Sequence, residues 1–316
     1  MSTPLVIGTS IAPKGIDSQR RAVESWLALG FEVLSLNVGE EIATLRPEFP
    51  GVRFVAAERT ASARAGRPLV YFDDLLGALA ATGRPVIGIV NSDVLLRADR
   101  ALADYVAREA RGAFLFGSRV DVDTPESEAG AMFEGGYDFF FFDRSLVGLY
   151  PKTDYSIGLP WWDYWAPMVP ALNGVPLKRL TTPIAFHVRH DLNWQSDTWL
   201  YYASIFARYV TLGFEEAAKR QQERGRNDAD LRWMHFVASL WTQLYRDRVQ
   251  QYQFTRQIVE KGSEAERARF KDDIGAAEFL LVKHYGNLAE SSCAFIKTVA
   301  EEVVFVPEPA SQAGST

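Results

Sequence analysis

Short apolar runs alternate with amphipathic segments along the first part of the chain. Apolar runs predict strands over 5–10, 31–37, 52–56 and 86–90. The run over 86–90 is apolar throughout, which is typical of a strand buried on both faces. Apolar residues at helical spacing predict helices over 18–29, 40–46 and 69–81. This alternation predicts an α/β domain with a doubly wound, mostly parallel sheet flanked by helices.

The pattern continues and then changes character. Further strands are expected over 113–118, 137–142 and 181–188, and helices over 99–111 and 160–172. The acidic, glycine-bearing segment 119–136 predicts a surface loop that orders over a ligand. From residue 197 onward, helical spacing dominates over 196–219, 228–261 and 265–301, and a strand signal returns only at 303–306.

This organisation predicts three parts of the chain. Residues 1–195 form the α/β domain, with a nucleotide-binding half over 1–99 and an acceptor half over 100–195. Residues 196–306 form a helical C-terminal subdomain. Residues 307–316 are rich in Pro, Ser, Ala and Gly and form a loose tail.

Composition narrows the class of protein. The chain has 316 residues, 47% hydrophobic and 23% charged, as in an ordinary soluble globular protein. A net charge of −6 gives no basic footprint for nucleic acid. The single cysteine, Cys293, excludes a disulfide framework and favours a packing role. We expect a cytoplasmic protein, because neither a signal peptide nor an apolar run of about 18 residues is visible.

The tripeptide Asn91-Ser92-Asp93 follows the buried strand directly. Ligands gather outside the carboxyl ends of such strands, and Asn91 and Asp93 can point the same way from the strand end. Asp93 is therefore a candidate ligand for a divalent cation that holds two phosphates, and Asn91 and Ser92 are candidate donor contacts. The alternative is a cap for a helix that starts near Val94 or Arg97.

A second cluster surrounds Asp163 with aromatic residues over 161–165. Asp163 is the candidate catalytic base, because partial burial raises a carboxyl pKa toward neutrality. Trp161, Trp162 and Trp165 are candidates for an acceptor platform, although aromatic clustering more often indicates core. The alternative for Asp163 is a favourable interaction with a helix dipole in the first turn.

A third cluster begins where the last predicted strand ends. His187 follows an apolar run directly and is the preferred late metal ligand, with His190 as the alternate. Arg189 is a candidate phosphate contact. Asp121, in the acidic segment, is a candidate contact for acceptor hydroxyls. The alternative is a strand-end histidine held by backbone bonds, beside a surface ion pair.

The order of these clusters resembles the GT-A glycosyltransferases. Asn91-Ser92-Asp93 looks like the Asp-x-Asp element, with Asn at its first place. Asp163 matches the position of the catalytic carboxylate, and His187 or His190 that of the late ligand. The segment 157–165 is similar to Gly-x-Pro-x-Trp-Asp-x-Trp blocks in uncharacterised bacterial glycosyltransferase-like proteins. The resemblance covers roughly residues 1–195 and does not account for the helical C-terminus.

The resemblance implies further roles. Thr9, Ser10 and Asn37 would line the base and ribose pocket of a nucleotide-diphosphate sugar, and Mn²⁺ or Mg²⁺ would hold its phosphates. The neutral amide of Asn91 lowers the expected dependence on metal, because it binds a hard cation less strongly than a carboxylate does. The C-terminal helices are candidates for dimerisation, for holding an acceptor, or for peripheral contact with a membrane-bound glycan assembly.

The function expected from the sequence is transfer of a sugar to a hydroxyl acceptor such as a glycan or lipid-linked saccharide. One alternative is a nucleotidyltransferase, which needs a glycine-rich basic phosphate loop, and the segment 11–15 is only a faint version of one. Another is a non-catalytic carbohydrate- or nucleotide-binding scaffold on the same fold, for which Asn91 is the best argument.

Overall fold

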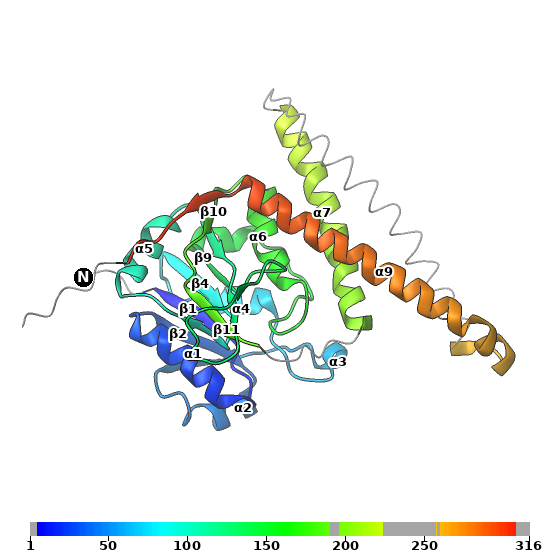
Figure 1. Ribbon diagram of the computed structural model, residues 1–316, viewed down its shortest axis with the longest axis horizontal. Helices are drawn as coiled ribbons and strands as arrows, with labels where there is room; N and C mark the ends of the chain where they lie inside the picture. Colours follow the sequence, from blue (N-terminus) through cyan, green and yellow to red (C-terminus); the bar gives the residue numbers. More distant parts are fainter. Residues whose placement is uncertain (1–4, 190–195, 224–256, 258–259, 308–316) are drawn as a thin grey trace, which may run out of the picture. The chain divides into compact units, whose positions relative to one another are not determined.

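The computed structural model describes residues 5–189, 196–223, 257 and 260–307 (Figure 1). The chain divides into two compact units, residues 1–193 with 296–316 and residues 194–295. His190, most of the helix expected over 228–261 and nearly all of the expected tail lie outside the described residues.

The first unit is built on an eight-stranded sheet. The strand order is β12-β10-β6-β9-β4-β1-β2-β3, and every neighbouring pair is parallel except the two that include β9. The predicted α/β class with a mostly parallel sheet is therefore confirmed. The strands are β1 (Val6–Thr9), β2 (Glu32–Asn37), β3 (Val52–Ala56), β4 (Val86–Val90), β6 (Phe114–Gly117), β9 (Phe139–Asp143), β10 (Leu177–Leu180) and β12 (Glu301–Val303).

Helices cover both faces of this sheet (Figure 1). One face packs against α1 (Ile16–Ala28) and α5 (Ala101–Glu109) in the main hydrophobic cluster. The other face packs against α4 (Phe72–Ala80) and α6 (Trp162–Leu172): Leu79 fills the space above Gly8, and Trp162 contacts Phe140. The other described helices of the first unit are α2 (Gly39–Leu45), α3 (Ser62–Ala65) and the 3₁₀ helix η1 (Arg144–Leu149).

A second, four-stranded sheet overturns two expectations. It has the order β5-β11-β7-β8 and consists of β5 (Val94–Leu96), β7 (Val120–Val122), β8 (Ala131–Met132) and β11 (Ala185–Val188). The segment 119–136 is thus not a surface loop throughout, because it contributes β7 and β8. Nor does a helix follow Asp93, because β5 begins at Val94, so the helix-capping alternative for this tripeptide is wrong.

The direction of β9 decides which residues meet at one edge of the main sheet. β9 is antiparallel to β4 and β6, and Phe139 at its start lies opposite Val90 and Gly117 at their ends. The residue before β9, Asp138, therefore lies at the same edge as the tripeptide that follows β4. In a fully parallel sheet only the carboxyl ends of strands meet at this edge. Here the beginning of the antiparallel strand β9 lies at the same edge.

The second unit contains α7 (Ser196–Glu223) and most of α9 (Glu264–Val299), so helices occur where helical spacing predicted them. Trp199 and Tyr285 bring the two helices together with ring centroids 6.2 Å apart. Cys293 is buried and forms no disulfide, in agreement with a packing role. Within the described part of the chain, no helix has the length and apolar character needed to cross a bilayer.

Candidate functional site

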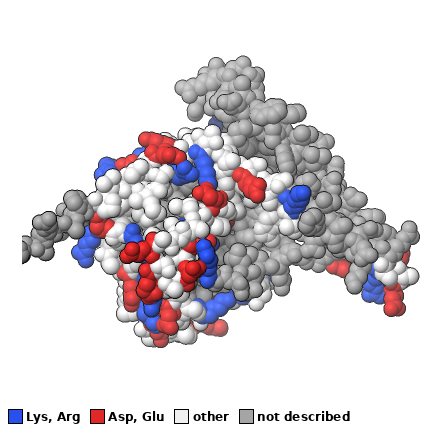
Figure 2. Space-filling model, in the orientation of Figure 1, with Lys and Arg blue, Asp and Glu red and all other residues white. Residues whose placement is uncertain are grey.

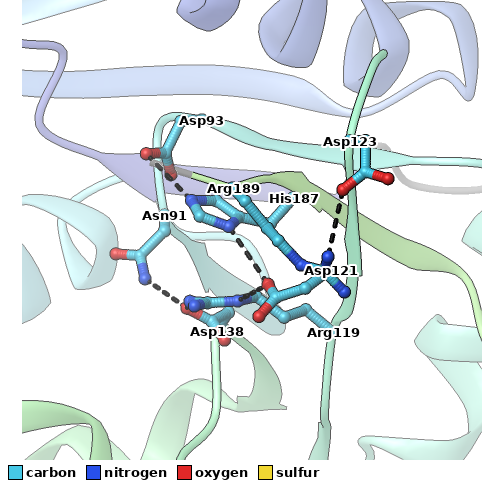
Figure 3. Close-up of polar contacts among 8 residues, drawn as sticks. All are labelled: Asn91, Asp93, Arg119, Asp121, Asp123, Asp138, His187 and Arg189. Carbon is cyan, nitrogen blue, oxygen red and sulfur yellow. Dashed lines mark hydrogen bonds and ion pairs between the residues drawn. The ribbon is translucent and has the colours of Figure 1, made fainter. Parts of the chain in front are cut away.

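His187 lies between two aspartates on β11, an interior strand of the second sheet (Figure 3). β11 pairs His187 with Val94 of β5 on one side and with Asp121 of β7 on the other. Nδ1 of the imidazole is 3.2 Å from Oδ1 of Asp121, and Nε2 is 3.5 Å from Oδ2 of Asp93. The strand register thus places this buried histidine where the third sequence cluster meets the first.

Arg119 continues this chain of contacts toward the main sheet (Figure 3). Its Nε donates to Oδ1 of Asp121 at 2.7 Å, and its Nη1 donates to Oδ1 of Asp138 at 2.7 Å. The same Oδ1 of Asp138 accepts a bond from Nδ2 of Asn91 at 2.8 Å. Because Asn91 and Asp93 share one turn, six side chains form a closed ring, here called the polar ring: Asn91, Asp93, His187, Asp121, Arg119 and Asp138.

Asp138 is the most buried carboxylate of the polar ring, with a residue exposure of 3%. Burial raises its pKa, while Arg119 and the hydrogen bond from Asn91 act in the opposite direction. Its second oxygen, Oδ2, is buried and has no hydrogen-bond partner among the described residues. Buried polar atoms are normally satisfied in native proteins, so this oxygen marks a place where a proton, water or ligand group completes the site.

Asp163 lies beside the polar ring, in the first turn of α6. Burial and the negative charge of Asp138 raise its pKa to about 7, against the opposing effect of Arg119. Its carboxylate packs closely on Gly136, where an added Cβ would come within 2.5 Å of Oδ2. Tyr164, the next residue, donates from its hydroxyl to the carbonyl of Gly135. The start of α6 is therefore fixed against the segment that leads to Asp138.

The turn into α6 has an unusual backbone. Trp161, at the N-cap, has φ 78° and ψ −13°, and it is the one non-glycine residue with positive φ in the described chain. A bulky side chain rarely adopts this conformation, and such residues cluster at functional sites. Trp161, Trp162 and Trp165 are all buried. They belong to the buried core of the first unit, and their role as acceptor contacts stays a prediction.

The loop after β1 is tied down by side chains of the first unit. Asn37 is buried; its Nδ2 donates to the carbonyl of Ile11 at 2.7 Å, and its Oδ1 accepts from Ser35. The backbone N–H of Ile11 donates to Oγ of Ser35 at 3.0 Å, and that of Ala12 donates to Oε1 of Gln19 at 2.7 Å. These contacts give Asn37 a role in holding the loop. Its expected contact with the nucleotide stays a prediction.

The remaining predicted donor residues differ in exposure. Thr9 is fully buried at the end of β1, and its hydroxyl has no hydrogen-bond partner among the described residues. Ser10 and Ser92 are partly exposed. Arg189 forms an exposed ion pair with Asp123 at 3.0 Å (Figure 3). Thr9, Ser10, Ser92 and Arg189 remain predictions as donor contacts.

The Asp93–His187 pair can hold one divalent cation. When Nδ1 of His187 is protonated and donates to Asp121, the lone pair on Nε2 faces Asp93. A separation of 3.5 Å between Nε2 and Oδ2 allows both atoms to bind one ion at about 2.1 Å. No group of three or more such side chains is arranged for a metal in the residues described. The other coordination positions would therefore belong to donor phosphates and water.

Sequence reasoning missed Arg119 and Asp138. Asp138 stands just before a run of four phenylalanines, Phe139 to Phe142, all of them buried. A charged residue directly before such a buried strand is the sequence feature that could have indicated a functional role for Asp138. The sequence does not show the direction of β9, so it does not show which edge of the sheet Asp138 occupies. Arg119 was included in a segment expected to be a surface loop, where arginines are usually solvated.

Charged side chains of both signs are interspersed on the face of the first unit seen in Figure 2. This face shows blue and red side chains side by side rather than one extended basic patch. That distribution agrees with the acidic balance of the sequence, a net charge of −6. Positive charge near the site comes from individual arginines such as Arg119, which the polar ring holds in place.

No family model and no curated protein matches this sequence. Among solved structures, HddC from Yersinia pseudotuberculosis is 12% identical, with 59% of this chain and 90% of that chain covered and a TM-score of 0.33. The 4-diphosphocytidyl-2C-methyl-D-erythritol synthase from Anaerococcus prevotii is 9% identical, with 65% and 96% covered and a TM-score of 0.35. A mycobacterial protein is 13% identical, with 72% and 76% covered and a TM-score of 0.39. None of these three is named as a glycosyltransferase, and similarity this low carries no argument about activity.

Proposed function

We propose that this chain is a transferase that takes a sugar from a nucleotide-diphosphate sugar and joins it to a hydroxyl acceptor. The observation that carries the proposal is the position of Asp163, in the first turn of α6 against Gly136, where burial and Asp138 raise its pKa to about 7. A general base works best when its pKa lies near the working pH. The sugar, the base of the nucleotide and the acceptor are left to experiment.

At the donor end, Asp93 and His187 are the side chains that would hold Mn²⁺ or Mg²⁺. When bound, the cation would stabilise negative charge on the departing diphosphate. Asp121 fixes the imidazole from its far side, as outer carboxylates do at histidine metal sites. Nδ2 of Asn91 donates to Asp138, so a contact between Asn91 and the donor or the cation would come from its Oδ1.

At the acceptor end, Asp163 would take the proton of the acceptor hydroxyl. As the bond from that oxygen to the anomeric carbon forms, the bond from this carbon to the donor phosphate oxygen breaks. The proton moves to the carboxylate of Asp163, and the nucleoside diphosphate leaves with the electron pair of the broken bond. Above pH 7 Asp163 is mostly ionised and ready to accept the proton. This role applies if the transfer inverts the anomeric centre.

A nucleotidyltransferase is the alternative that the sequence left open. Such an enzyme would use backbone N–H groups of the loop after β1 to bind phosphate. In this structure the N–H groups of Ile11 and Ala12 already donate to Ser35 and Gln19. These two N–H groups are therefore not available to a phosphate. The products distinguish the two reactions, because nucleotidyl transfer from a nucleoside triphosphate releases pyrophosphate and sugar transfer releases a nucleoside diphosphate.

The test is a product assay with a panel of UDP-, GDP-, ADP- and dTDP-sugars, Mn²⁺ and simple alkyl glycoside acceptors. We expect one donor class to release nucleoside diphosphate. The Asp163→Asn variant should lower the rate by about 10²–10⁴-fold, whereas Asp104→Asn, at an exposed position on α5, should retain it. Pyrophosphate release from a nucleoside triphosphate and a sugar phosphate would favour the alternative. Binding of a donor without any product would favour the scaffold.

A further inference from the structure

The carboxylate and the backbone carbonyl of Asp138 are both held by hydrogen bonds. Its Oδ1 accepts two hydrogen bonds, from Nδ2 of Asn91 at 2.8 Å and from Nη1 of Arg119 at 2.7 Å. The backbone carbonyl of Asp138 also accepts from the N–H of Asn91 at 3.1 Å. These contacts prevent the carboxylate from turning, and they leave Oδ2 buried without a hydrogen-bond partner among the described residues.

Asp163 is held close to this carboxylate from a different element. Its side chain packs on Gly136, two residues before Asp138, at a distance that leaves no room for a Cβ. The hydroxyl of Tyr164 fastens the same turn of α6 to the carbonyl of Gly135. Two carboxyl groups, one from the start of β9 and one from the start of α6, are therefore kept together by short-range contacts.

Arg119 is the cation that balances this pair. Its guanidinium lies over the ring of Phe133, 4.3 Å from the centroid, and bonds Asp121 and Asp138 at the same time. Burial lowers the pKa of Arg119, but the two aspartates raise it by more, so the arginine remains charged. One fixed positive charge thus faces three carboxyl groups, those of Asp121, Asp138 and Asp163.

We propose that Asp138 is a positioning residue, a fixed buried carboxylate that, opposed by Arg119, adds to the effect of burial on the protonation of Asp163. The inference rests on the proposed function, because it explains how Asp163 becomes a base suited to neutral pH. Like charges that share a buried site raise the proton affinity of one partner. Asp138 never needs to touch the acceptor, since its effect reaches the reacting atoms through Asp163.

Among the described residues, further charged or titratable groups act on the pair or lie near it, and Asp121 is one of them because it shares Arg119 with Asp138. Arg119 acts on both carboxyl groups, and His187 on β11 acts on Asp138. On the segment between β8 and β9, Glu134 is engaged in an ion pair with Lys297. Because the pair interacts strongly, its two protons leave in coupled steps. Substitution of one group must therefore change the titration of the other.

The test is a direct titration of the aspartate side chains in the unliganded full chain. Aspartate labelled with ¹³C at Cγ would be followed by NMR from pH 4 to pH 9, with the signal of Asp163 assigned by its loss in Asp163→Asn. In the native chain we expect its midpoint near 7. In Asp138→Asn the midpoint should fall by about one pH unit or more. Asp143→Asn, at the other end of β9, is the matched control and should leave it unchanged.

Arg119→Gln tests the Asp138–Asp163 pair through an opposite change of the Asp163 midpoint. Removal of the positive charge should raise that midpoint. This variant therefore tests the inference even if Asp138→Asn does not fold. An unchanged midpoint in a folded Asp138→Asn or Arg119→Gln variant would overturn the inference. The titration needs no substrate. A chain that shows the expected shifts but transfers no sugar would refute the proposed function alone, and a chain that transfers sugar without them would refute this inference alone.

Discussion

Asn91 donates a hydrogen bond from Nδ2 to Oδ1 of Asp138, over 2.8 Å. This contact gives a physical reason for the amide at the first place of the Asn91-Ser92-Asp93 tripeptide. A carboxylate there would face another carboxylate at hydrogen-bond distance with no proton between them. The tripeptide has Asn rather than Asp at its first place because Asp138, just before β9, needs a hydrogen-bond donor there.

Asn91→Asp should therefore destabilise the protein at neutral pH. Loss of the donor and repulsion between the two carboxylates should cost on the order of 1–3 kcal/mol. The loss should shrink as the pH falls, because protonation of one carboxyl group restores a donor. Thermal denaturation from pH 4 to pH 8 measures this. Asn91→Ala removes the hydrogen bond without adding charge, and an equal pH dependence in both variants would contradict the explanation.

Asp163 makes the stability of the native chain depend on pH. Its pKa of about 7 in the folded state lies above the ordinary value of 3.8 for an aspartate, so the folded state holds this proton more tightly than the unfolded state. The favourable contribution is complete below pH 4 and is lost as the pH rises through 7. Asp163→Asn should therefore gain stability relative to the native chain over this range, by at most roughly 4 kcal/mol. Urea denaturation at pH 4, 6 and 8 checks the sign, and a constant difference would argue against the raised pKa.

Gly136 gives a steric test of the same carboxylate. An added Cβ would come within 2.5 Å of Oδ2 of Asp163, so Gly136→Ala must displace either Asp163 or the segment that leads to Asp138. We expect kcat to fall by about 10-fold or more, because small misplacements of a catalytic group are costly. Gly148→Ala on η1 is the control, since a Cβ there meets nothing within 4 Å. Equal steady-state rates for the two variants would show that the position of Asp163 does not matter.

Asp121 should matter for the cation even though it is not proposed to bind it. Its carboxylate is 3.2 Å from Nδ1 of His187 and orients the ring toward Asp93. Asp121→Asn should weaken Mn²⁺ binding by about 10–100-fold in the presence of the nucleoside diphosphate that the donor assay identifies. Electron paramagnetic resonance of free Mn²⁺ gives this affinity. Undiminished affinity in the variant would remove Asp121 from the metal site, and Asp104→Asn serves again as the unaffected control.

The sequence predicted the first four strands of the main sheet better than it predicted the candidate site. β1 to β4 coincide with the expected runs within two residues. For β1 and β4 the reason is that strands buried on both faces have continuous apolar sequences. Asp93 and His187, both expected from the sequence to bind the cation, lie 3.5 Å apart. The pairing of β11 with β5, which the sequence did not predict, brings them together.

The rest of the site depends on pairings that no local pattern encodes. β5 and β7 are three residues long, and they are held as strands by β11, which lies far along the chain. The antiparallel direction of β9 is likewise set by its neighbours and not by its own four phenylalanines. For this reason Arg119 and Asp138 emerged only from the fold.

The most direct test of the central claim is donor binding followed by thermal shift, with and without Mn²⁺. A ligand that binds only the folded state raises the melting temperature. We predict that one class of nucleotide-diphosphate sugar raises it only when Mn²⁺ is present, and that Asp93→Asn abolishes this rise while Asp104→Asn keeps it. A rise that is the same without metal or in Asp93→Asn, or no rise with any such sugar, would contradict the account.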